Sequence, residues 1–294
     1  MITDILLPVA LAVIMFAMGL SLRVADFTLV FTRPKAMALG LLAQMVLLPL
    51  VAWSVVLVVP MPTDFAIGLL ILAACPGGIT SNLLTHLAGG ATALAVSLTA
   101  ITSVFGALSV PFVVNLALVH VGGQGTVDLP VARMTLGVFV VATLPLILAM
   151  SLNHRWPKES ARVEKLTRHV ATILFAFIVV GAFSSQWRTM MNHAVDVLPP
   201  ALAINVAAMA LAWLVGRLGR LERREKLAVV LETGLQNGAL GIFVAATLLG
   251  SPAMMVPSIV YALVMNVTAL GVIVWARVLS GKEKGGVSPA FSRK

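Results

Sequence analysis

The residues best suited to chemistry lie in the stretch 231–241, which reads Leu-Glu-Thr-Gly-Leu-Gln-Asn-Gly-Ala-Leu-Gly. Glu232 is the one acidic residue in the interior of a long apolar segment, and Gln236 follows it four residues later. Residues four apart share a face of an intact helix. An ionisable group inside such a segment costs about 3 kcal/mol or more and usually faces a partner or a water-filled cavity. Glu232 is therefore predicted to be functional, the alternative being a carboxylate capped by neighbouring helices for packing alone.

A second polar group interrupts an earlier apolar segment. Pro76, Gly77 and Gly78 are followed at once by the run Thr80-Ser81-Asn82, and proline with two glycines breaks a helix. Thr99 and Gln44 add further oxygen atoms within apolar segments. Carboxylate, amide, hydroxyl and freed carbonyl oxygens suit a hard cation. One carboxylate among neutral oxygens matches Na⁺ better than Ca²⁺, although each polar side chain alone could serve an interhelical hydrogen bond worth about 0.6–2 kcal/mol.

The composition is that of an integral membrane protein. Of the 294 residues, 60% are hydrophobic and 11% are charged, whereas a soluble domain carries about 25% charged residues. Residues 1–4 carry no Lys or Arg, so the first apolar segment is expected to be a retained span and not a signal peptide. We predict an all-α fold of nine transmembrane helices, at about 3–22, 36–59, 65–88, 92–118, 132–152, 166–186, 198–216, 227–249 and 254–279. The breaks between them fall at links such as 32–35, 59–62 and 198–200.

The distribution of Lys and Arg supports this count. With the N-terminus outside, 18 of the 20 basic residues fall in inside loops or in the C-terminal tail, and only Arg133 and Arg188 fall outside. The net charge of +9 is thereby explained by topology, facing the cytoplasmic leaflet, and nucleic acid is not predicted as a partner. The absence of an Arg/Ser-rich transit sequence favours a bacterial plasma membrane. Residues 281–294 are expected to form a disordered, basic cytoplasmic tail.

The two interrupted segments are the third and the eighth, so they cross the membrane in opposite directions. Spans one to four and six to nine then form two halves of inverted topology, each with its third helix broken. Paired broken helices of this kind indicate the midplane binding site of a secondary transporter. The chain contains no hydrolase, zinc-protease or nucleotide-binding motif and only one cysteine, Cys75, so it is predicted not to be an enzyme.

These motifs resemble those of the bile acid:sodium symporter family. The resemblance rests on residues 75–82 (Cys-Pro-Gly-Gly-Ile-Thr-Ser-Asn) and 232–237 (Glu-Thr-Gly-Leu-Gln-Asn), with support from residues 15–20 and from 33–35 leading to Gln44. It covers essentially the whole chain and implies a core domain with two crossing broken helices, packed against a panel domain. The implied core comprises the spans at 36–59, 65–88, 92–118, 198–216, 227–249 and 254–279, and the panel those at 3–22, 132–152 and 166–186, within one transporter unit of residues 1–280.

The resemblance also implies two sodium sites at the crossing. The first would use Ser81, Asn82, Thr99 and Glu232. The second would use Gln44, Glu232 and Gln236 with the backbone carbonyls of Thr233 and Leu235. Ala95 stands where the family often has a hydroxyl residue, so the first site would lack one ligand. The positions expected to bind substrate are Thr80, Asn237 and Asn266.

The resulting hypothesis is a sodium-coupled symporter that imports an organic anion by alternating access, with two Na⁺ ions as coupling ions. The anion would be bile-acid-like or a small carboxylate such as pantoate, and the lipid bilayer is the other predicted partner; no protein partner is predicted. Two alternatives remain open. One is an exporter of the same superfamily, similar to arsenite permeases, with Cys75 as a thiol ligand. The other is a membrane receptor that binds an anion without moving it.

Overall fold

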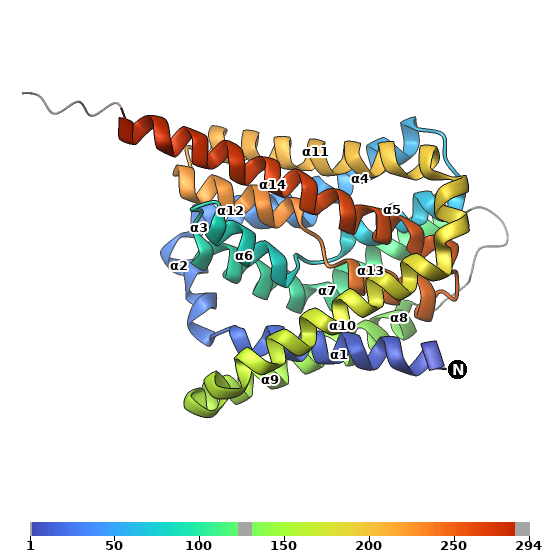
Figure 1. The fold of residues 1–294 in the computed structure, drawn as a ribbon, viewed down its shortest axis with the longest axis horizontal. Coiled ribbons are helices and arrows are strands. Elements are labelled where there is room, and N and C mark those ends of the chain that lie inside the picture. Colours follow the sequence, from blue (N-terminus) through green and yellow to red (C-terminus); the bar gives the residue numbers. More distant parts are fainter. Residues whose placement is uncertain (1, 123–130, 286–294) are drawn as a thin grey trace, which may run out of the picture.

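The computed structural model describes residues 2–122 and 131–285. Within them the chain is helical throughout, apart from loops and one isolated bridge between Gly77 and Gln236. Helices α11 and α14 form the upper edge of Figure 1, and α1 and α9 the lower edge. The α-helices longer than four residues are α1 (Ile2–Ser21), α3 (Pro34–Leu42), α4 (Leu48–Val58), α5 (Thr63–Ala74), α6 (Ile79–Leu87), α7 (Thr92–His120), α8 (Val131–Val138), α9 (Leu144–Arg155), α10 (Pro157–Asn192), α11 (Ala194–Leu218), α12 (Arg223–Gly234), α13 (Gly238–Phe243) and α14 (Val256–Gly285).

Length and composition make this a multi-pass membrane protein. Among the described residues, six helical stretches can cross a membrane: Pro34–Val58, Thr92–His120, Val131–Arg155, Pro157–Asn192, Ala194–Leu218 and Ala253–Val278. The number becomes seven if Ile5–Ser21 and Val24–Thr32, which meet at 71°, count as one span. The stretches Thr63–Ala74 and Gly238–Leu248 are apolar but shorter. The predicted count of nine joins such short helices across the two breaks, and it stays a prediction.

Two of the spanning stretches contain a wide π-helical turn just before a proline. The turn at Ala43–Leu47 precedes Pro49, and the turn at Phe139–Thr143 precedes Pro145. Proline has no N–H to give to the preceding turn, and its ring clashes with the carbonyl there. A π-turn relieves this conflict locally, and such turns often occur at functional sites. The first of the two carries Gln44, whose side chain is buried.

Two sequence expectations about helix ends are wrong. Pro199 and Pro200 do not break the chain, because α11 begins at Ala194 and continues through both. The prolines lie in the second turn of the helix, so the helical hydrogen bonds that they cannot donate are those to the carbonyls of Val195 and Asp196 near its start. The tail was expected to begin at 281, yet α14 continues to Gly285; residues 286–294 of the predicted tail lie outside the described residues.

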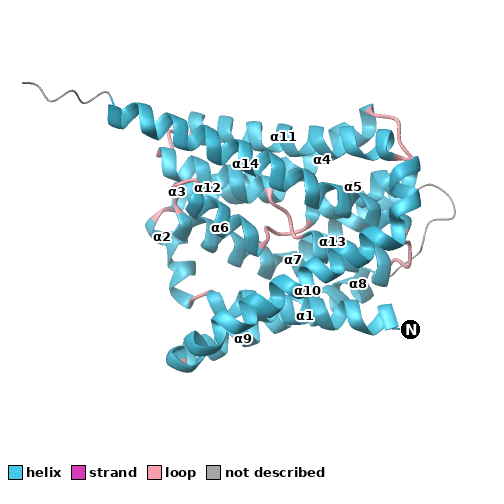
Figure 2. Ribbon diagram, viewed as in Figure 1, coloured by secondary structure: helices cyan, strands magenta, loops and turns pink. Residues whose placement is uncertain are grey.

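The two interrupted helices occupy the interior. In α5 every residue from Phe65 to Ala74 is buried, and in α12 every residue from Leu227 to Gly234. By contrast, only 17% of the apolar part of α10 is buried, which is the pattern of a peripheral, lipid-facing helix. Helix α1 packs mainly against α9 and α10. Figure 2 shows the loops of both breaks near the centre of the molecule, between α6 and α13.

Candidate functional site

The two breaks lie against each other and run in opposite directions. Helix α5 ends at Ala74 and α6 begins at Ile79, while α12 ends at Gly234 and α13 begins at Gly238. The two loops pair as a minimal antiparallel bridge: Gly78 N–H donates to the Leu235 carbonyl (3.2 Å) and Asn237 N–H donates to the Pro76 carbonyl (2.9 Å). Irregular backbone at membrane depth is tolerated only where its polar groups find partners. The pairing supplies them and fixes the crossing.

Glu232 lies at this crossing, in the last turns of α12, and is 1% exposed. Ser81 Oγ donates to its Oε2 and Thr99 Oγ1 donates to its Oε1, each at 2.6 Å. None of the ion pairs found among the described residues includes Glu232. A buried carboxylate is therefore held by two neutral hydroxyls, although burial of a charge without a counter-charge is costly.

Acceptors outnumber protons around this carboxylate. Ser81 Oγ also lies 2.7 Å from the Gly78 carbonyl, and Thr99 Oγ1 lies 3.0 Å from the Ala95 carbonyl and 3.5 Å from Asn82 Oδ1. The two hydroxyls carry one proton each, yet five oxygen atoms are placed to accept them. The unused lone pairs and the negative charge are what a hard cation requires. The arrangement brings together Ser81, Asn82, Thr99 and Glu232, the four residues predicted for the first site.

Gly77 is what lets the carboxylate reach the crossing. A Cβ at this position would lie 2.0 Å from Glu232 Oε1 and 2.7 Å from its Cδ. Both glycines with positive φ in the described chain, Gly89 and Gly250, lie elsewhere. Glycine is thus required at position 77 for space and not for backbone conformation.

The residues predicted for the second site also meet, but their amides satisfy one another. Gln44 Nε2 donates to Gln236 Oε1 (3.0 Å) and to the Cys75 carbonyl (3.3 Å). Gln236 Nε2 donates in return to Gln44 Oε1 (3.4 Å) and to the Thr233 carbonyl (2.8 Å). Four acceptors here face four amide protons, so no surplus of oxygen atoms exists. The Leu235 carbonyl is used by the loop pairing described above.

A cavity of about 90 Å³ lies beside the crossing. Its walls come from α1, α10, α14 and both broken-helix loops, and its lining is Ile14, Met15, Met18, Gly78, Thr80, Arg168, Ala171, Thr172, Phe175, Gln236, Asn237, Gly238 and Met265. Thr80 and Asn237, two predicted substrate-binding residues, belong to this lining. The Asn237 side chain also caps α13, accepting from Leu240 N–H (3.1 Å), and its Nδ2 approaches Met15 Sδ (3.5 Å).

Asn266, the third predicted substrate-binding residue, does not line this cavity. Its side chain is exposed and donates to the Ala262 carbonyl of its own helix (2.6 Å). The neighbouring Met265 faces the cavity instead, because consecutive residues of a helix point about 100° apart.

Several residues of the site were missed from the sequence. Arg168, Thr172 and Phe175 of α10 line the cavity, and their spacing of four and three residues is that of one helix face. The sequence shows this spacing, but Arg168 was interpreted only as one of the basic residues that set the topology. Asn205 and Tyr261 were also missed: Asn205 Nδ2 and Tyr261 Oη both donate to the Gly234 carbonyl at the end of α12, at 2.8 and 3.3 Å.

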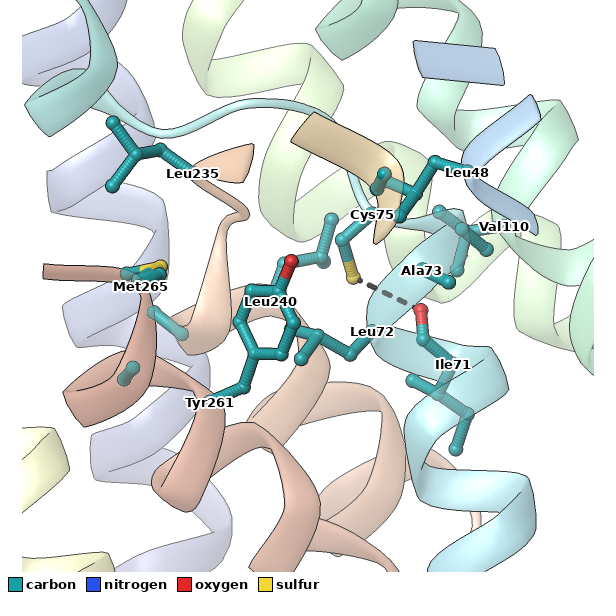
Figure 3. Packing of buried hydrophobic residues seen from close by; sticks show 14 of the residues in the cluster. Leu48, Ile71, Leu72, Ala73, Cys75, Val110, Leu235, Leu240, Tyr261 and Met265 are labelled. Carbon is teal, nitrogen blue, oxygen red and sulfur yellow. Dashed lines mark hydrogen bonds between the residues drawn. The ribbon is translucent and has the colours of Figure 1, made fainter. Parts of the chain in front are cut away.

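Cys75 is not among the residues that line this cavity. Its thiol is buried and donates to the Ile71 carbonyl one turn earlier in α5, at 3.3 Å (Figure 3). In the same view Cys75 is surrounded by apolar side chains such as Leu48, Leu72 and Leu240. A thiol in such surroundings behaves as a small apolar group.

Two crossed, broken helices inside a bundle of apolar helices are typical of secondary membrane transporters. Comparison with known proteins gives the family: residues 8–193 match the model of the sodium bile acid symporter family. The chain belongs to that family.

Its similarity to individual members extends along most of the chain. It is 27% identical to the uncharacterized sodium-dependent transporter YocS of Bacillus subtilis over 285 residues, covering 96% of this chain and 86% of that protein. It is 27% identical to the human ileal sodium/bile acid cotransporter over 239 residues, covering 79% of this chain and 66% of that one. The similarity to the bovine sodium-dependent organic anion transporter is 25% over 227 residues, 77% of this chain and 60% of that one.

Proposed function

We propose that this protein is a sodium-coupled symporter that imports an organic anion by alternating access. The observation that carries the proposal is the environment of Glu232: a buried carboxylate with no cationic partner among the described residues, in a surplus of oxygen acceptors, where two broken helices cross. The names of the human and bovine relatives, a sodium/bile acid cotransporter and a sodium-dependent organic anion transporter, support the same direction.

Two Na⁺ ions are proposed as the coupling ions. The first would bind at Ser81, Asn82, Thr99 and Glu232, where the surplus of acceptors supports a cation directly. The second would bind at Gln44, Glu232, Gln236, Thr233 and Leu235, and there the paired amides have to exchange partners before their oxygens can face an ion. The first site therefore needs less rearrangement than the second to bind Na⁺, although Ala95 supplies no hydroxyl ligand.

Two ions give a useful driving force. A tenfold sodium gradient supplies about 1.4 kcal/mol per ion. Two Na⁺ with one monovalent anion carry one net positive charge, which adds about 2.3 kcal/mol for each 100 mV of membrane potential. Together these terms support accumulation of the anion by roughly a thousandfold or more.

The proposed architecture has nine spans in two inverted halves, with the N-terminus outside and the C-terminus in the cytoplasm of a bacterial cell. Each broken pair, α5 with α6 and α12 with α13, would count as one span. The panel would consist of α1, α10 and the stretch Val131–Arg155, and the core of the remaining spans. The packing of α1 mainly against α9 and α10 supports this division. Alternating access would move core and panel relative to each other around the crossing.

The exporter and receptor hypotheses make different predictions. A thiol-dependent exporter needs a reachable Cys75, and the bond from its thiol to Ile71 argues against one. Sodium-driven uptake that survives in Cys75→Ala would eliminate this hypothesis. A receptor would bind the anion without moving it across a sealed membrane. Uptake of the anion into proteoliposomes would eliminate the receptor hypothesis.

The test of the proposed function is Glu232→Gln, with Glu159→Gln as the matched control, because Glu159 is an exposed carboxylate on α10. The full chain is reconstituted in proteoliposomes, and uptake of labelled taurocholate, pantoate and pyruvate is measured with an inward gradient of sodium or of choline. Glu232→Gln is expected to abolish the sodium-dependent part of the uptake and the stabilisation of the purified protein by sodium. The variant should still unfold cooperatively on heating, which shows that it is folded. Full sodium-driven uptake in Glu232→Gln would refute the mechanism.

A further inference from the structure

The cavity beside the crossing has one charged residue among its thirteen lining residues, Arg168. Arg168 lies on α10, and Thr172 and Phe175 of the same face continue the wall. The opposite wall is formed by the broken-helix loops, including Gly78 and Gln236. Most of the remaining lining is apolar, namely Ile14, Met15, Met18, Ala171 and Met265. A ligand in this cavity would therefore contact one cationic side chain, the polar loops and a flexible apolar surface.

Arg168 is held by a partner that lies outside the cavity. Its guanidinium donates to Glu164 Oε1 one turn earlier in α10, and Glu164 is not part of the lining. The Arg168 side chain is 59% exposed and that of Glu164 27% exposed. Where water reaches an ion pair this exposed, the pair contributes little to stability, because solvent screens it. Such a pair exchanges readily for a better acceptor.

We propose that Arg168 is the residue that receives the acidic group of the transported anion, and that it exchanges its ion pair with Glu164 for one with the substrate. This inference rests on the proposed function, since it names the substrate contact of the same transporter. The planar guanidinium offers paired N–H donors that match a carboxylate, which a point charge such as lysine does not. In the structure Glu164 Oε1 accepts from one of these donors, Nη2.

The cavity also indicates the size of the anion. At about 90 Å³ the cavity is much smaller than the roughly 300–1,000 Å³ of pockets that hold drug-sized ligands. This is the space for a short organic acid, whose apolar body would pack against Met15, Met18 and Phe175. A steroid acid needs the cavity to widen. An acid bound in this way would contact α10 at one end and the broken-helix loops at the other. It would therefore connect α10 with the crossing of the two broken helices.

The test uses the purified full-length protein in sodium chloride, with butyrate, hexanoate and octanoate as probes and hexanamide as the neutral counterpart of hexanoate. Binding is measured as thermal stabilisation across a concentration series. The wild type is expected to bind at least one of the acids more tightly than it binds hexanamide. Arg168→Gln is expected to weaken binding of that acid about tenfold, with binding of hexanamide unchanged. Glu164→Gln frees the guanidinium and is expected to strengthen acid binding about twofold to fivefold.

Two further variants separate recognition from structural or general electrostatic effects. Arg162→Gln removes the same charge from an exposed position of α10 that does not line the cavity, and it is expected to bind the acids as the wild type does. The exchange Glu164→Arg with Arg168→Glu keeps an ion pair on the helix but removes the cation from the cavity wall, and acid binding is expected to stay lost. An equal loss in Arg162→Gln, or restored binding in the exchange variant, would overturn the assignment.

Failure of this inference and failure of the proposed function give different results. If the wild type binds none of the acids better than hexanamide, or Arg168→Gln binds them normally, while sodium still stabilises the protein, the assignment of Arg168 is wrong and sodium coupling stands. If Arg168→Gln loses acid binding but sodium affects neither stability nor acid binding in the wild type, Arg168 stands and sodium coupling is wrong.

Discussion

Replacement of Gly77 by alanine is the sharpest test of the crossing, because it reaches Glu232 without changing any polar group. The new Cβ would lie 2.0 Å from Glu232 Oε1, whereas contacts below 3.0 Å are essentially never seen. The carboxylate or the loop has to move by about 1 Å. The loop is fixed by the bonds from Gly78 to Leu235 and from Asn237 to Pro76, so the carboxylate is expected to move.

The magnitude follows from the bonds that such a movement breaks. The hydrogen bonds from Ser81 and Thr99 to the carboxylate are both 2.6 Å long, and a displacement of 1 Å takes at least one of them beyond bonding distance. A hydrogen bond to a charged group is worth about 1.5–3 kcal/mol. Gly77→Ala should therefore lower the free energy of unfolding by about 2–5 kcal/mol and weaken sodium binding by a factor of about 100 if both bonds are lost.

Gly78→Ala is the matched control. Its backbone has φ −101° and ψ 166°, and a Cβ there would meet its nearest neighbour, the Gln236 carbonyl oxygen, at 3.5 Å. A double-mutant cycle adds a second control: in a Glu232→Ala background the clash is gone, so Gly77→Ala should cost little there. Sodium-dependent thermal unfolding of the purified protein, with choline in place of sodium as reference, gives both quantities. Equal sodium binding by Gly77→Ala and Gly78→Ala would refute the assignment of Glu232 to a cation site.

Two further changes probe the surroundings of the crossing. Ala95→Ser adds a hydroxyl at the position where the first sodium site lacks a ligand, and sodium titrations should give about threefold tighter binding; unchanged or weaker binding would mean that position 95 does not face the ion. Tyr261→Phe removes the 3.3 Å hydrogen bond to the Gly234 carbonyl and should lower the free energy of unfolding by about 1 kcal/mol. Asn205→Ala, which removes the shorter bond of 2.8 Å, should cost more, and the reverse order in thermal unfolding would contradict the roles given to the two donors.

The sequence predicted the two breaks because their cause is local. Proline and glycine after Cys75 cannot continue a helix, and the glycines around Gln236 weaken one. The isolated Glu232 was equally readable, since a carboxylate in an apolar segment is rare for a physical reason that needs no structure. The meeting of Ser81, Thr99 and Glu232 was inferred from family resemblance, because spacing within one helix says nothing about partners on others.

What the sequence could not provide depends on packing between distant helices. Gln44 lies in a π-turn and pairs with Gln236 of the broken-helix loop; family resemblance placed the two residues in one site, but no pattern near residue 44 predicts their mutual hydrogen bonds. Asn266 was predicted for the cavity, but the rotation of α14 turns Met265 inward instead. Arg168 followed the charge bias of inside loops, and that bias concealed its second role as part of a cavity wall. In each case the residue type indicated a polar role, but the direction in which the side chain points could not be predicted from the sequence.

The crossing offers a physical reason why ion and anion should depend on each other. Gly78 and Gln236 line the cavity and also belong to the two loops that enclose Glu232. The carboxylate is balanced by hydroxyls, and the two loops are joined by two backbone hydrogen bonds and by Gln44, which donates to both the Cys75 carbonyl and Gln236. A cation that drew the oxygens of both loops toward it would fix the same backbone that forms the floor of the cavity. By linkage, an anion that binds the fixed floor more tightly must in turn tighten the cation by the same factor. In the proposed mechanism, coupling needs no signal across a distance, because both cargoes would bind to one pair of loops.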